Sequence, residues 1–128
     1  MSKQLLDNLS AAWNRQDVEA VLEYFSVDGT YHDVMGEDPL GKTYFGHAAI
    51  REALVNTFAA FPGARLLPMG EPIVGDDGRA ASEWIFEYQD AAGQAAQMHG
   101  CDFFVISDGK VKVKNAYMKA YVQSDAAV

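Results

Sequence analysis

The chain has 128 residues, a length that suits one domain able to bury roughly two thirds of the surface that its unfolded form exposes. Its composition, 49% hydrophobic and 22% charged, is that of an ordinary globular protein. The net charge of -8 argues against a nucleic acid or a membrane surface as partner, because binding to phosphates requires a basic face.

The sequence also lacks the marks of membrane insertion and secretion. No apolar run approaches the roughly 20 residues of a membrane span, and the first residues lead into an amphipathic pattern rather than a signal peptide. We therefore expect a cytoplasmic protein. The single Cys101 can form no internal disulfide and belongs to no zinc cluster of cysteines.

The first half of the chain has the pattern of helices. Apolar residues at helical spacing predict amphipathic helices over residues 3–15 and 46–61, the second ended by Pro62 and Gly63. Asp17 is suited to cap a further helix over residues 18–25. A short strand at 30–34 and a loop at 35–44 lie between, and the loop is long enough to cover a site.

After residue 62 the pattern alternates as in strands. Residues 64–74, 79–89, 95–107 and 110–123 read as four strands, the last three following turns that contain glycine. The chain is thus predicted to form a single α+β domain over residues 1–128, with three N-terminal helices on one face of a strongly bent, mostly antiparallel sheet. Residues 124–128 are expected to be frayed.

The alternation assigns side chains to the two faces of this sheet. Trp84 and Phe86 share a face that we expect to lie under the helices, and Asp102 shares the corresponding face of the next strand. The opposite face of that strand is also apolar, because it carries Phe103 and Val105. A chain too small to cover both faces is expected to form a homodimer through this outer face. On the last strand, periodicity alone does not decide whether Lys114 points inward.

Four segments carry a family resemblance: DVEAV (17–21), TYHD (30–33), GHAAIRE (46–52) and FEYQ (86–89). They resemble ketosteroid isomerase and, more broadly, the nuclear-transport-factor-2-like superfamily that includes SnoaL-like polyketide cyclases. The resemblance spans about residues 10–121. It implies a cone-shaped α+β barrel with a deep pocket, which is usually dimeric and which hosts isomerases, cyclases, dehydratases, hydrolases and binding domains alike.

The resemblance also implies roles for particular residues. Asp33 matches the general base of the isomerase, and Asp102 matches the protonated aspartate of its oxyanion hole. Two tyrosines of the isomerase fall at Leu9 and Leu54, which cannot donate hydrogen bonds. The strand aspartate of the SnoaL-like cyclases falls at Ala116. The same alignment directs Lys114 into the pocket.

The residues themselves leave alternatives open. Asp33 is either a base or a polar residue that caps nearby backbone, and Tyr31 on the same face is either a hydrogen-bond donor or a core residue. Asp102 is either a neutral donor or the partner of Lys114 in a buried ion pair. Lys114 is an exposed strand lysine, the partner of Asp102, or an amine able to form a Schiff base with a carbonyl ligand.

Other kinds of site are not indicated. His32, His47 and His99 show no metal-ligand spacing, and His32 and His99 are expected to point outward, so we predict no metal. The glycine pairs lie in hairpin turns, not between a strand and a helix, and no serine nucleophile elbow is present. We therefore expect neither a nucleotide cofactor nor acyl-enzyme chemistry, and no cofactor of any kind.

These observations favour an acid/base enzyme that needs no cofactor: an isomerase, cyclase or lyase acting on a small, mostly apolar carbonyl compound, such as a ketone, in a deep pocket. The alternative is a noncatalytic module of the same fold that binds a small molecule or dimerises. The predicted catalytic residues are Asp33, Asp102, Tyr31 and Lys114. The predicted walls of the pocket are Trp13, Phe58, Trp84, Phe86, Met98, Ala116 and Met118.

Overall fold

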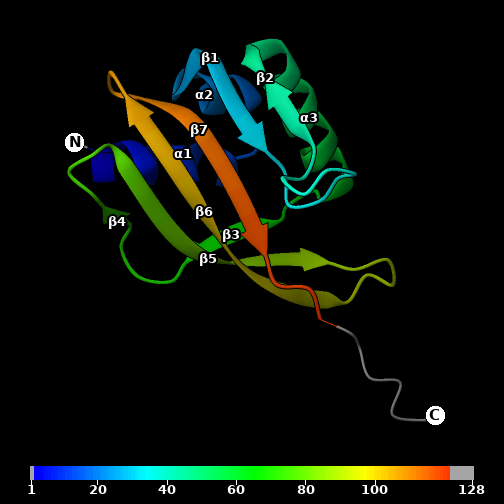
Figure 1. Cartoon of the computed structure of the whole chain (residues 1–128). Coiled ribbons are helices and arrows are strands. Elements are labelled where there is room, and N and C mark those ends of the chain that lie inside the picture. Colours follow the sequence, from blue (N-terminus) through cyan, green and yellow to red (C-terminus); the bar gives the residue numbers. More distant parts are fainter. Residues whose placement is uncertain (1, 122–128) are drawn as a thin grey trace.

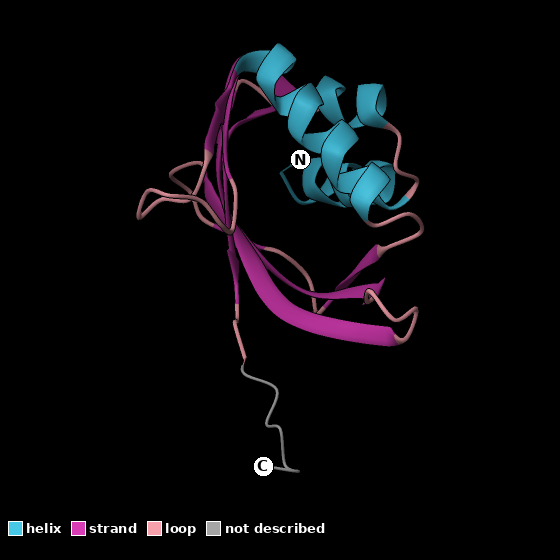
Figure 2. Ribbon diagram, turned by 90° about the vertical axis from the view of Figure 1, so that its right-hand side faces the viewer, coloured by secondary structure: helices cyan, strands magenta, loops and turns pink. Residues whose placement is uncertain are grey.

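The computed structural model describes residues 2–121 and confirms an α+β fold. Its helices are α1 (Ser2–Asn14), α2 (Val18–Glu23) and α3 (Gly46–Ala60). Its strands form one curled, unclosed sheet in the order β2-β1-β7-β6-β5-β3, with β4 beside β5, and the helices lie on the concave side (Figures 1 and 2). The strands are β1 (Phe25–His32), β2 (Thr43–Phe45), β3 (Arg65–Pro68), β4 (Ile73–Val74), β5 (Arg79–Gln89), β6 (Ala95–Ser107) and β7 (Lys110–Met118).

The helices form where the apolar spacing predicts them. The Asp17 carboxylate accepts a hydrogen bond from the Ala20 amide and so caps α2, as expected from the sequence. The buried side of α1 includes Leu9 and Trp13, and that of α3 includes Ile50 and Leu54. These apolar faces pack toward the sheet and close the space above its concave face.

None of the helices in residues 2–121 is long and apolar enough to cross a membrane.

Several predicted boundaries were wrong, each because of pairing between distant segments. Phe25 starts β1 instead of ending α2, because it pairs in parallel with Val111 of β7. Thr43 and Tyr44, predicted to be the end of the loop at 35–44, form β2 together with Phe45, against the end of β1. The predicted strand 64–74 is divided into β3 and β4, with Gly70 at φ 87° and Pro72 between them. The last strand ends at Met118, and residues 122–128, including the predicted frayed end, lie outside the described residues.

The long hairpin of β5 and β6 has the predicted bounds and the predicted faces. Asp102 and Phe104 are buried on the concave side, whereas Phe103 and Val105 are 46% and 39% exposed on the outer face. The alternation therefore separates the two faces of β6 correctly.

A bulge in β7 explains why its inward face could not be assigned from periodicity. Val111 pairs with Ile106 and Val113 pairs with Val105, so β7 has one more residue than β6 at this point, Lys112. The extra residue reverses the alternation. Val111 is completely buried before the bulge, and Lys114 lies on the inward face after it.

Candidate active site

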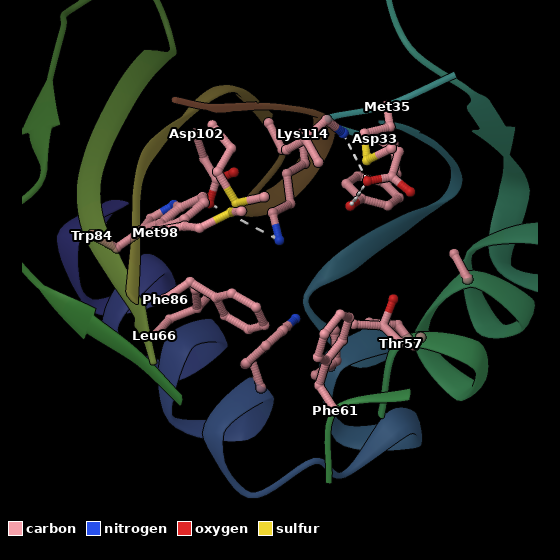
Figure 3. Close-up of a pocket in the computed structure, with 18 of the residues that line it drawn as sticks. Asp33, Met35, Thr57, Phe61, Leu66, Trp84, Phe86, Met98, Asp102 and Lys114 are labelled. Atoms are coloured by element: carbon pink, nitrogen blue, oxygen red, sulfur yellow. Dashed lines mark hydrogen bonds and ion pairs between the residues drawn. The ribbon is translucent and has the colours of Figure 1, made fainter. Parts of the chain in front are cut away.

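A cavity of about 340 Å³ lies between the helices and the concave face of the sheet. Six of the seven predicted wall residues line it, and so do residues that we had not assigned to its walls, such as Phe61 and Leu66 (Figure 3). Phe58 is the exception. It is 8% exposed and packs edge-on against Trp13 at 5.2 Å between ring centroids, so it supports the wall from the core and is not part of it. The six predicted wall residues that do line the cavity are Trp13, Trp84, Phe86, Met98, Ala116 and Met118.

Asp33 follows the end of β1 and faces the cavity together with Tyr31. Its Oδ1 atom accepts hydrogen bonds from the Tyr31 hydroxyl at 3.1 Å and from the Val34 amide at 2.7 Å. Oδ2 receives none from residues 2–121. The carboxylate is thus held by one oxygen while the other is available to a ligand.

Tyr31 combines the two possibilities that the sequence leaves open. Its hydroxyl donates a hydrogen bond to Asp33, and its ring packs against the hydrophobic core. Burial, and then the negative charges of Asp33 and Asp102, raise the pKa of Tyr31 well above its ordinary value of 10. The hydroxyl therefore keeps its proton and acts as an orienting donor to the Asp33 carboxylate.

Asp102 is the buried polar residue of the core, with 4% of its surface exposed. Its Oδ2 atom accepts a hydrogen bond from Trp84 Nε1 at 2.9 Å, and its Oδ1 atom has no partner among the described residues. Burial raises the pKa of this carboxyl above 3.8, and the charge of Lys114 and the Trp84 hydrogen bond oppose that rise only in part. Asp102 therefore has an environment that favours its neutral form.

Trp84 reaches Asp102 because of a glycine on the neighbouring strand. Trp84 of β5 pairs with Gly100 of β6, and a Cβ atom at position 100 would lie only 2.4 Å from the indole ring. The absence of that atom lets the ring lie across β6. Sequence reasoning placed Trp84 in the wall but missed its role as a donor to Asp102, although the facing of the two residues follows from the hairpin register.

Lys114 completes the polar part of the cavity. It is paired with Tyr31 across β1 and β7, and its side chain is 11% exposed, which rules out the alternative of an exposed strand lysine. Its Nζ atom lies 4.0 Å from Asp102 Oδ2 and 5.4 Å from the centre of the Tyr31 ring. Figure 3 shows Lys114 extending between Asp102 and Asp33. All four predicted catalytic residues therefore line the same cavity.

The loop after β1 contributes to the rim of the cavity. Val34 and Met35 line it, and the loop is closed by hydrogen bonds from the Asp33 amide to Lys42 O and from the Lys42 amide to Met35 O. Gly41, at φ 76°, passes so close to the Asp33 carbonyl that a Cβ atom there would lie 2.0 Å from its oxygen. The loop thereby fixes the backbone of Asp33.

The three histidines lie away from this site. His32 shares a hydrogen bond with the Thr43 hydroxyl, and His47 shares one with the Phe25 carbonyl. His99 is exposed on the outer face of β6. None of them lines the cavity.

Solved structures of known proteins share this fold. The protein TerC, co-crystallised with polyporic acid, is 26% identical, with a TM-score of 0.77 over 91% of this chain and 89% of its own. A candidate polyketide cyclase of Pseudomonas putida KT2440 is 23% identical, with a TM-score of 0.72 over 98% and 95% of the two chains. A protein of Catenulispora acidiphila DSM 44928 with a ketosteroid isomerase-like fold, solved with trimethylamine, is 17% identical, with a TM-score of 0.77 over 88% and 83%.

Sequence comparison identifies the family directly. A comparison with curated proteins finds no match. The model of the SnoaL-like domain, in contrast, matches residues 6–113, which is most of the chain. The chain therefore belongs to the SnoaL-like domain family.

Proposed function

We propose that this SnoaL-like chain is an enzyme of the cyclase, isomerase or lyase type that uses no cofactor and moves a proton on a small, mostly apolar carbonyl compound. The observation that carries the proposal is the composition of the cavity. Its walls are mainly apolar, and two carboxyl groups and an amine, those of Asp33, Asp102 and Lys114, reach it from neighbouring strands and the end of β1. Apolar cavities with a few convergent polar groups are typical of binding and active sites.

Asp33 is suited to act as the general base. One of its oxygens is fixed by Tyr31 and Val34, and the other is free of hydrogen bonds from the described residues. A carboxylate held in this way can take a proton from a carbon next to the ligand's carbonyl group. The hydrogen bonds from Tyr31 and Val34 both go to Oδ1, so they orient the carboxylate and leave Oδ2 to take the proton.

Asp102 is suited to stabilise the oxygen on which negative charge develops. Because burial raises its pKa, the carboxyl keeps its proton to higher pH than an exposed aspartate and can donate a hydrogen bond. Lys114 adds a positive charge close to the same place. An enolate formed by Asp33 would then lead to isomerisation, aldol-type cyclisation or dehydration.

The second candidate function is noncatalytic binding of a small molecule. Leu54 lines the cavity at a position where the resemblance to ketosteroid isomerase places a tyrosine, and Leu9 lies buried in the core at the other such position. The chain therefore has no hydroxyl donor at either of these two positions. This difference favours a binder that has kept the fold and lost the reaction.

We also propose that two copies of the chain associate through the outer face of β6 and β7. Phe103 and Tyr117 lie edge to face on it, with 5.6 Å between their ring centroids, and are 46% and 51% exposed. Val105 beside them is 39% exposed. A second copy would remove these apolar side chains from water.

Proton exchange in deuterium oxide separates the two candidate functions. We would incubate the protein with polyporic acid, the compound co-crystallised with TerC, and with a panel of aromatic ketones, and follow both by NMR. Loss of the proton signals next to a ketone carbonyl, at a rate above that of buffer, supports the enzyme. Shifted ligand or protein signals without any exchange support the binding module.

A further inference from the structure

Lys114 differs from the lysines whose partners lie on the surface. Lys3 is paired with Glu71 and Lys112 with Asp28, both within hydrogen-bond distance and both largely in water. Surface pairs of this kind contribute little to stability. The Lys114 side chain is only 11% exposed, yet its ammonium makes no hydrogen bond with residues 2–121, and its nearest carboxylate oxygen is 4.0 Å away.

The carboxyl next to it is also incompletely bonded. Asp102 Oδ1 is buried and has no hydrogen-bond partner in the described part of the chain. Asp102 pairs with Ala116, two residues from Lys114, so the two side chains are diagonal neighbours on the same inward face of β6 and β7. One wall of the cavity therefore contains a positively charged donor and a buried carboxyl oxygen, neither of which has a hydrogen-bond partner among residues 2–121.

Burying such groups without partners is unfavourable. A desolvated ammonium is stabilised by an acceptor close to it, and a buried carboxyl oxygen by a donor or acceptor of its own. The other polar groups around the Lys114 side chain do not supply that acceptor: the Tyr31 ring contacts the ammonium through its face, and Trp84 donates to Asp102. Within the described part of the chain, no acceptor lies within hydrogen-bond distance of the Lys114 ammonium, and a ligand can bring one.

We propose that Lys114 is a specificity-determining residue for acidic carbonyl ligands, whose ionised oxygen, a carboxylate or an ionised enol, binds the Lys114 ammonium and lies against Asp102. This inference rests on the proposed function, since it names the class of ligand that the same cavity binds. Asp33, on the other side of Lys114 in Figure 3, stays available to the remainder of the ligand. The pairing is charge-assisted, which makes it stronger than a bond between neutral groups.

A consequence is that binding of such a ligand raises the pKa of Asp102 further, so the protein takes up a proton at any pH at which Asp102 is ionised before the ligand binds. A negative charge placed beside Asp102 disfavours its ionised form, and burial already disfavours it. The ionised oxygen and the protonated carboxyl can then share a hydrogen bond. The groups that take part in this equilibrium are Asp102, Lys114, Asp33 and the hydroxyl of Tyr31, which all face the cavity.

Two matched pairs of compounds test the proposal by titration calorimetry at neutral pH. The first pair is 2-naphthoate and its neutral amide, 2-naphthamide. The second is 2-hydroxy-1,4-naphthoquinone, which is an ionised enol at this pH, and its methyl ether. We expect the protein to bind the ionised member of at least one pair about tenfold more tightly, and the pair that shows the preference identifies the acidic group.

Variants assign the preference to the residue. Lys114→Met should bind both members of the pair with equal affinity, whereas Lys114→Arg, which keeps the charge, should retain part of the preference and show by its thermal unfolding that the fold tolerates a change at this position. Lys112→Met, two residues away on the same strand but on the surface, is the matched control and should behave as the unchanged protein.

The proposal is overturned if the ionised member of neither pair binds more tightly, including the case in which none of the four compounds binds. It is also overturned if Lys114→Met keeps the full preference. Because these measurements follow binding alone, a protein that prefers the ionised compounds but exchanges no ketone protons would contradict the proposed reaction and leave the role of Lys114 supported.

Discussion

The Nζ atom of Lys114 and the Oδ2 atom of Asp102 lie 4.0 Å apart on adjacent strands, close enough for their charges to interact but too far for a hydrogen bond. The same oxygen of Asp102 accepts a hydrogen bond from Trp84 instead. An ion pair and a neutral carboxyl at this position differ in how the stability of the protein responds to pH.

The pH dependence of stability distinguishes a neutral Asp102 from an ion-paired one. Below about pH 3.8 the carboxyl is protonated in the folded and the unfolded chain, so its contribution to folding is fully present. As pH rises through the raised folded-state pKa, the folded protein must ionise a buried group and that contribution is lost. The free energy of unfolding of the protein, minus that of Asp102→Asn, should therefore fall as pH rises above about 4.

Urea unfolding of both proteins across this range measures the difference, in which most other titrating groups cancel. A difference that rises with pH would mean that the folded-state pKa of Asp102 is lowered, as in a strong ion pair with Lys114. The same comparison in the Lys114→Met background is a useful companion, because loss of the ammonium removes a charge that lowers the pKa of Asp102 and should extend the fall to higher pH.

Gly100→Ala should displace the Trp84 indole. The new methyl group would lie 2.4 Å from the ring and 2.4 Å from the carbonyl oxygen of Tyr117, so the neighbours must move. We expect a loss of roughly 1 to 3 kcal/mol of stability, typical of overpacking, and altered tryptophan fluorescence as the hydrogen bond to Asp102 is lost. His99→Ala, at the exposed neighbouring position, is the control. If Gly100→Ala unfolds like the unchanged protein, Trp84 is not fixed against β6.

Phe103→Glu should prevent the association that we propose for the outer face. A charge in the centre of an apolar interface is costly to bury, whereas it costs little on a face open to water. Sedimentation equilibrium should show a dimer for the unchanged protein and a monomer for the variant. Val27→Glu changes a 78% exposed valine on β1 and should remain dimeric. A monomeric unchanged protein would contradict the proposal.

Local patterns in the sequence were sufficient to predict much of the fold. The bounds of β5 and β6 follow from turn signals at both ends of each strand, and the inward direction of Asp102 follows from alternation along β6. The resemblance to ketosteroid isomerase predicted that Asp33 and Asp102 face the same cavity. No local pattern in the sequence indicates this.

The remaining features depend on contacts between distant residues. The inward direction of Lys114 depends on the bulge at Lys112. Periodicity cannot predict this direction, because the bulge interrupts the alternation of side chains along β7. Phe25 has helical spacing, but it belongs to β1 because β7 lies next to it in parallel. Phe58 has the apolar character of a wall residue, but its ring packs edge-on against Trp13, which lines the cavity in its place.

The central claim is that Asp33 removes a proton from a carbonyl ligand in this cavity. Its most direct test is the rate of deuterium exchange next to the carbonyl of a ketone substrate, compared between the unchanged protein, Asp33→Asn and Asp7→Asn, the last being the same substitution at an exposed position of α1. We predict that Asp33→Asn lowers the rate by about 100-fold or more while its ligand affinity stays nearly the same, and that Asp7→Asn has no effect. Equal exchange rates for Asp33→Asn and the unchanged protein would contradict the assignment of Asp33 as the base.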